Sequence, residues 1–137
     1  MNTKLDDTCT RFKEEINTIE LCLGQVGKHL ASAADTGVDA LEVELDRATE
    51  KREAKREQAA HAGHRIKQLL EESKENVVTK FEDWKTDREI EKIEKDADKK
   101  EQQAVDAIVV AAYALLEAEV AIVDALKARK MAIEVAG

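Results

Sequence analysis

The sequence predicts an all-α protein, in which long antiparallel helices form a coiled-coil-like three-helix bundle, with a four-helix bundle as the alternative. The 137 residues include no proline and only five glycines. Sandwiches, barrels and α/β folds need many turns, and turns use Gly and Pro. Charged residues make up 38% of the chain and aromatic residues 3%, which is typical of long helices rich in Ala, Glu, Lys and Leu. The length fits one domain, residues 1–137.

The first predicted helix spans residues 5–33. Its apolar residues recur at alternating spacings of four and three, which is a heptad seam: Leu5, Cys9, Phe12, Ile16, Ile19, Leu23, Val26, Leu30 and Ala33. Thr3 begins a variant of a capping box, and Gly37 can adopt the left-handed conformation that ends a helix. Gly24 and Gly27 lie inside the helix and each costs about 1 kcal/mol relative to Ala. We expect a close helix contact there, with a kink as the alternative.

The second helix is predicted from Val38 to Ser73 and the third from Val77 to Val135, with a turn at residues 72–76. A break near Asp98 would divide the third helix and give the four-helix alternative. With the turn at this position, the numbers of opposed residues add up to about 149. Ile66 then meets Trp84. The cations Arg52 and Lys55, which occupy core-type positions, then lie beside three acids of the third helix: Glu94, Asp96 and Asp98.

The third helix carries a wide apolar stripe from residue 104 onward. In the register above, the second helix covers the stripe only as far as about Ile108. Burying a large apolar side chain is worth about 1.5–3 kcal/mol, so side chains left without an intrachain partner predict a homodimer. The predicted interface consists of Leu115, Leu116, Val120, Ile122, Val123, Leu126 and Ile133.

Charge and cysteine content bear on partners and compartment. The net charge of −8 disfavours general nucleic-acid binding. Four acids within residues 104–125 exclude a transmembrane helix there, and no secretory signal is expected at the N-terminus. We expect a cytoplasmic protein with reduced Cys9 and Cys22, although an intermolecular disulfide stays open.

Few residues have the pattern of a chemical site. Glu57, His61 and His64 share one helical face and are weak candidates for zinc ligands. They lie off the apolar seam and lack further converging ligands, so neither a metal nor another cofactor is expected. We find no arrangement of catalytic residues. Glu119 falls within the apolar stripe, where we expect it to meet Lys127 or a lysine of a partner.

Three function classes remain. The leading hypothesis is a non-enzymatic helical interaction or scaffold protein that acts as a homo-oligomer and can bind a further protein partner. The alternative is an amphipathic coat or adaptor protein on a lipid or polymer granule, suggested by the alanine-rich stripe of residues 104–133. Its acidic balance speaks against this alternative, because surface-binding helices usually carry Lys and Arg. A metal-binding helical bundle ranks last.

Overall fold

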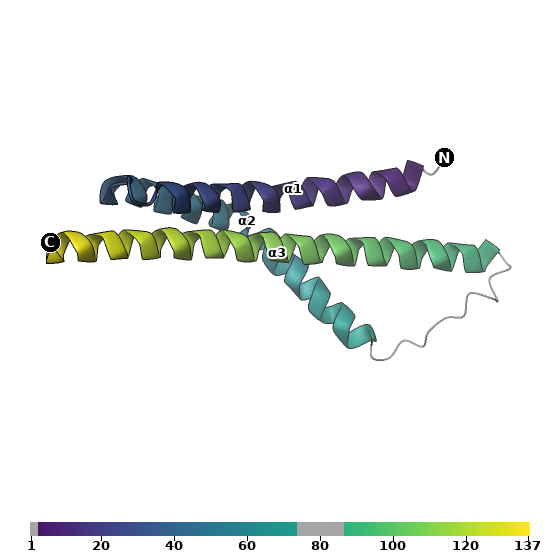
Figure 1. Cartoon of the computed structure of the whole chain (residues 1–137). Helices are drawn as coiled ribbons and strands as arrows, with labels where there is room; N and C mark the ends of the chain where they lie inside the picture. The colour runs from purple at the N-terminus through teal and green to yellow at the C-terminus, as the bar shows by residue number, and fades with distance from the viewer. Residues whose placement is uncertain (1–2, 74–86) are drawn as a thin grey trace.

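The computed structural model describes residues 3–73 and 87–137 and contains three long helices (Figure 1). These are α1 (Thr3–Ser32), α2 (Val38–Ser73) and α3 (Asp87–Ala136). No strand occurs in the described ranges. The prediction of an all-α fold built from packed long helices is confirmed.

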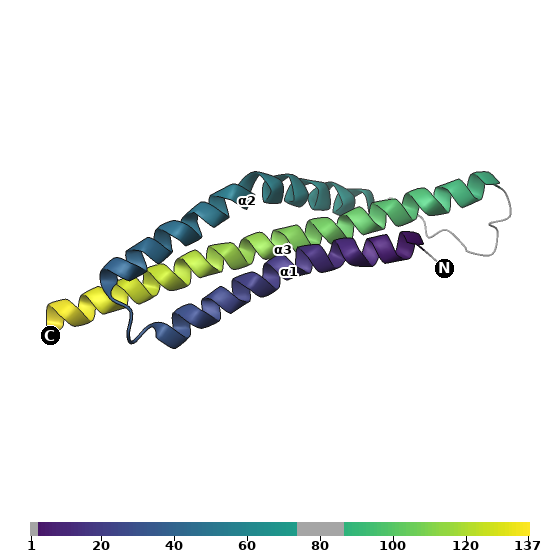
Figure 2. The same ribbon diagram turned by 90° about the horizontal axis from the view of Figure 1, so that it is seen from above.

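Helix α3 lies between the other two and packs against both of them (Figure 2). It runs parallel to α1: Thr8 pairs with Glu101, and His29 pairs with Glu119, so both partners lie further toward the C-terminus in the second pair. Within the described residues, the backbones of α1 and α2 do not approach each other as closely as each approaches α3. The molecule is therefore a layer of helices with α3 as the shared element.

Helix α2 runs antiparallel to α3, but not in the predicted register. Arg65 binds Asp106, and Lys51 binds Glu119. The paired numbers add up to 171 and 170 instead of about 149. The predicted pairing of Arg52 and Lys55 with residues 94–98 is therefore wrong.

The physical reason for the register is the burial of two acids on α3. The prediction assumed a tight reversal at residues 72–76 and matched apolar with apolar positions. Asp106 and Glu119 are each 1% exposed, and a buried charge must be paired. In the observed register a cation of α2 meets each of these two acids. Residues 72 and 73 of the predicted turn belong to α2. Residues 74–76 of the turn and Trp84 lie outside the described residues.

Helix α3 is continuous through Asp98, which settles the choice between three and four helices over the part of the chain that the structure describes. The alternative with a break near Asp98 is therefore wrong, and the continuous third helix is confirmed over residues 87–136. Residues 87–103 are charged but keep a helical composition, and the ion pair of Lys100 with Asp96 (3.0 Å) supports a helical turn there.

The connection between α1 and α2 is short and is held by backbone hydrogen bonds. Asp35 N donates to Ser32 O (3.0 Å), and Leu41 N donates to Gly37 O (3.0 Å). Gly37 thus precedes α2 as its N-terminal cap, a position that glycine tolerates. No described residue has a positive φ, so the predicted left-handed conformation of Gly37 is wrong.

Small side chains bring α2 close to α3. The buried residues of α2 are mostly alanines, and those of α3 are mainly branched aliphatic residues, which suits tight helix packing. The central cluster consists of Ala59, Ala62, Val105 and Val109, and the partly buried Phe12, Val110 and Tyr113 pack against it. This cluster joins all three helices.

Candidate functional site

The apolar stripe on α3 is largely used inside the chain. Leu116 and Val123 are buried, and only Ile133, at 61%, is mainly exposed. The remaining members of the predicted dimer interface are half-buried: Leu115, Val120, Ile122 and Leu126. The argument that these side chains lack an intrachain partner is wrong for all of them except Ile133, because the observed register carries α2 along the C-terminal half of α3.

Glu119 forms a buried polar cluster that joins the three helices. Its carboxylate lies 3.1 Å from Nε2 of His29 on α1 and 3.4 Å from Nζ of Lys51 on α2. The expectation that Glu119 meets Lys127 is wrong, because Lys127 pairs with Glu42 instead. The cluster fixes the relative positions of all three helices, since each helix contributes one member.

Cys22 lies next to this cluster and is buried, whereas Cys9 is exposed. Burial raises the pKa of the Cys22 thiol, and the nearby charge of Glu119 raises it further, against a smaller opposing effect of Lys51. A thiol with a raised pKa is mostly protonated and is a poor nucleophile. Both cysteines are free thiols in the structure.

A second polar cluster surrounds Asp106. Arg65 donates two hydrogen bonds to its carboxylate (2.9 and 2.8 Å), and Gln102 donates a third (2.9 Å). Burial by itself raises the pKa of Asp106, but the hydrogen bonds from Arg65 and Gln102 and the charges of Arg65 and Arg11 hold it below its ordinary value. The carboxylate is therefore a fixed negative charge that holds α2 and α3 in register.

The weak metal candidates lie on the surface of α2. His61 Nε2 is 3.7 Å from Oε1 of Glu57, and both side chains are mainly exposed, as is His64. Among the residues that the structure describes, no group of three or more His, Cys, Asp or Glu side chains is arranged to hold a metal ion.

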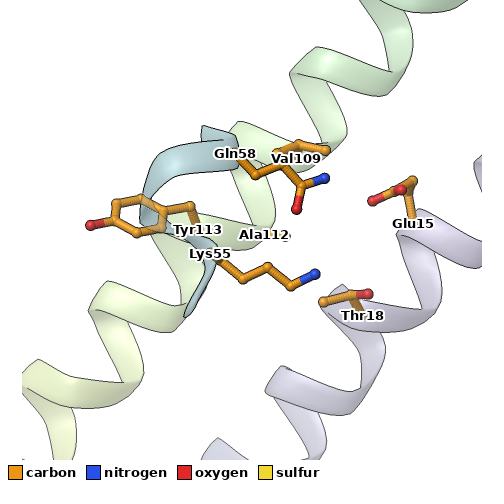
Figure 3. Close-up of a pocket in the computed structure, with 7 residues that line it drawn as sticks. All are labelled: Glu15, Thr18, Lys55, Gln58, Val109, Ala112 and Tyr113. Atoms are coloured by element: carbon orange, nitrogen blue, oxygen red, sulfur yellow. The ribbon is translucent and has the colours of Figure 1, made fainter. Parts of the chain in front are cut away.

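A shallow hollow lies where the three helices meet, and it has room for about one water molecule. Figure 3 shows Lys55 and Gln58 of α2 extending toward Glu15 and Thr18 of α1, while the hydroxyl of Tyr113 points away from them. Val109 and Ala112 of α3 complete the lining. The hollow is too small for an organic ligand.

A row of exposed side chains lies along α1, and we call it the outer row: Cys9, Ile16, Leu23 and Leu30. Ile16, Leu23 and Leu30 are 42%, 52% and 57% exposed. Their seven-residue spacing puts them on one side of the helix. This side is turned away from α2: Thr18, which lines the hollow with α2 residues, lies about 160° around the helix from Ile16.

The outer row belongs to the predicted heptad seam, of which α3 uses only part. Phe12, Ile19, Val26 and Ala33 are half-buried, as a seam facing another helix requires. The fully buried residues of α1, Cys22 and His29, lie outside the predicted seam. The expected close helix contact at Gly24 and Gly27 is also wrong, because a Cβ built on either residue meets no atom within 4 Å.

No family model, curated protein or solved structure matches this chain. In the described part of the chain, no helix combines the length and hydropathy needed to cross a membrane.

Proposed function

We propose that the chain is a non-enzymatic helical interaction protein that acts as a homo-oligomer, a dimer in its simplest form. The observation that carries the proposal is the outer row of α1, where three large aliphatic side chains in one line are about half exposed. Soluble monomers rarely leave large contiguous apolar patches in water, and such patches mark interaction surfaces. A helix with an apolar line at seven-residue spacing is suited to bind another helix.

The polar clusters support this role. Glu119 and Asp106 hold the three helices in one arrangement, so the outer row is presented on a defined scaffold. An interaction surface gains affinity when it is preorganised before the partner arrives. The two free thiols fit a reducing compartment, and we place the protein in the cytoplasm in this proposal.

Sedimentation equilibrium of the full chain tests the proposal. We expect a species of at least twice 15.3 kDa at micromolar concentration. Leu23→Glu places a charge in the outer row and should reduce the mass to that of the monomer. Leu21→Glu is the matched control, because Leu21 is 65% exposed on the same helix but lies off the seam.

A 15.3 kDa species throughout the micromolar range would overturn the homo-oligomer. Circular dichroism of both variants shows whether the helices are retained. If Leu21→Glu and Leu23→Glu lower the mass equally, the outer row is not the interaction surface.

A further inference from the structure

The heptad seam of α1 has two rows, and they are occupied unequally. The middle row consists of Phe12, Ile19, Val26 and Ala33 and is half-buried. The outer row is exposed. On its flank opposite the middle row, Gly24 and Gly27 carry no side chain, and no atom lies within 4 Å of a Cβ built on either. In a two-helix coiled coil the two rows of the seam face the partner together. A second helix therefore fits over the outer and middle rows, beside α3 and on the side away from α2.

The seam is complementary to itself when two copies of α1 run antiparallel. In this orientation each outer-row residue meets a residue of the other seam row on the second helix. Ile16 then lies opposite the partner's Ile19, and Leu23 opposite the partner's Phe12. The same register brings together Cys9 with the partner's Val26 and Leu30 with the partner's Leu5, which is 58% exposed. Every layer is apolar, and two-fold symmetry repeats each layer.

The charges beside the seam select the antiparallel orientation. Lys13 and Glu20 flank the exposed side of the seam and have no ion-pair partner among the described residues. The antiparallel register puts Lys13 next to Glu20 of the partner, twice per dimer. In a parallel pair Lys13 of one helix and Glu20 of the other would be displaced by about 10 Å along the helix axes and could not pair.

Helix α3 extends the same surface. Ile108, Leu115 and Ile122 are spaced by seven residues and are half-buried. Ile108 lies about 160° around α3 from Asp106, which faces α2, so this line is on the flank away from α2. The two-fold axis of the antiparallel pair is perpendicular to the plane of the two α1 helices, so both α3 helices lie on the same side of that plane. The flank of α3 that carries Ile108, Leu115 and Ile122 therefore adjoins the partner subunit. Leu115 and Ile122, two residues of the sequence-predicted interface, thus border the contact.

From these observations we infer that the outer row is the dimer contact, and that α1 of a second copy covers it in antiparallel orientation with Ile16 opposite the partner's Ile19. The inference rests on the proposed function and adds the surface, the orientation and the register.

Disulfide mapping of the full chain tests the orientation. In a variant with Cys22→Ala and Val26→Cys, the thiols at positions 9 and 26 are separated by about 25 Å along one helix and cannot bridge within it. Under mild oxidation the antiparallel pair joins position 9 to position 26 of the other copy. A parallel pair joins 9 to 9 and 26 to 26. Cleavage after Arg11 and Lys13 puts the two thiols on separate peptides, so mass spectrometry distinguishes the two patterns.

Leu21→Cys in place of Val26→Cys is the matched control, because it offers an exposed thiol on the same helix but off the seam. It should give at most a small fraction of crosslinked dimer under the same conditions. Mainly 9-to-9 and 26-to-26 bridges in a dimeric chain would overturn the antiparallel inference and leave the proposed function standing. A monomer at micromolar concentration would overturn both.

A charge exchange tests the register independently. Lys13→Glu makes both flanking pairs repulsive and should weaken the dimer about tenfold. Adding Glu20→Lys should restore the wild-type affinity, because the pairs form again with reversed sign. Lys28→Glu makes the same change in net charge off the seam and should have little effect. A double variant no tighter than Lys13→Glu would overturn the register.

Discussion

Replacing His29 with leucine removes the closest partner of a fully buried carboxylate. Glu119 is 1% exposed, and it accepts from His29 at 3.1 Å and from Lys51 at 3.4 Å. The side chain of Lys51 is 38% exposed, so it cannot shield the carboxylate as fully as the buried imidazole does. Because a hydrogen bond to a charged group contributes about 1.5–3 kcal/mol, we expect His29→Leu to lower the free energy of unfolding by about 2–3 kcal/mol.

The double variant His29→Leu/Glu119→Leu should recover most of this loss. Removing the carboxylate as well abolishes its desolvation cost, and buried ionic groups can often be replaced by apolar residues of similar volume at little cost. We expect the double variant to lie within about 1 kcal/mol of the wild type. Glu119→Leu alone leaves the buried imidazole without its partner and should cost about 1–2 kcal/mol.

Urea unfolding followed by circular dichroism, at one protein concentration, measures all four members of this cycle. His61→Leu is the matched control, because His61 is exposed and lies 3.7 Å from an exposed Glu57, and it should change the free energy by less than about 0.5 kcal/mol. The reasoning fails if the two single losses simply add in the double variant, because the buried pair would then not act as a unit.

Three further predictions follow from the other groups described above. Asp106 has a lowered pKa in the folded chain, so its contribution to stability is present above its ordinary pKa and is lost as the pH falls below about 4; urea unfolding from pH 2 to pH 6 should show this loss in the wild type and a flatter profile in Asp106→Asn. Because burial raises the pKa of Cys22, a thiol reagent at pH 8 should modify Cys9 at least about tenfold faster than Cys22 in the monomeric Leu23→Glu variant, in which no second copy covers Cys9, and equal rates by mass spectrometry would contradict the buried position of Cys22. Metal analysis of untagged protein should find less than stoichiometric zinc at Glu57, His61 and His64, and zinc that is lost in His61→Ala would refute this.

The sequence predicted the helices better than their register. The absence of proline and the seam of α1 indicated an all-α bundle, and the predicted ends of α2, Val38 and Ser73, agree with the structure. These features are local, because they depend on composition and on spacing within one helix. Register depends on which distant residues meet, and apolar matching between alanine-rich helices discriminates weakly.

A signal for the register was nevertheless present. Asp106 and Glu119, the two acids at buried positions of α3, are 13 residues apart, and the cations Arg65 and Lys51 on α2 are 14 residues apart. Matching these two acids with two cations at nearly equal spacing leads close to the observed register, because another pair that fits, Lys55 and Lys67, shifts it by only about three residues. The buried position of His29 on α1 was harder to foresee, because His29 becomes a core residue only when Glu119 lies opposite it.

The position of α3 between the other two helices has a consequence for synthesis on the ribosome. Thr8 and Glu101 are 93 residues apart, so α1 can pack against α3 only after the residues between them have been translated. At about 5–20 residues per second this interval lasts roughly 5–20 s. The alanines of α2 have no aliphatic surface to pack against during that time, since α1 and α2 do not pair closely with each other. The packing of both helices is therefore completed only after α3 has been translated.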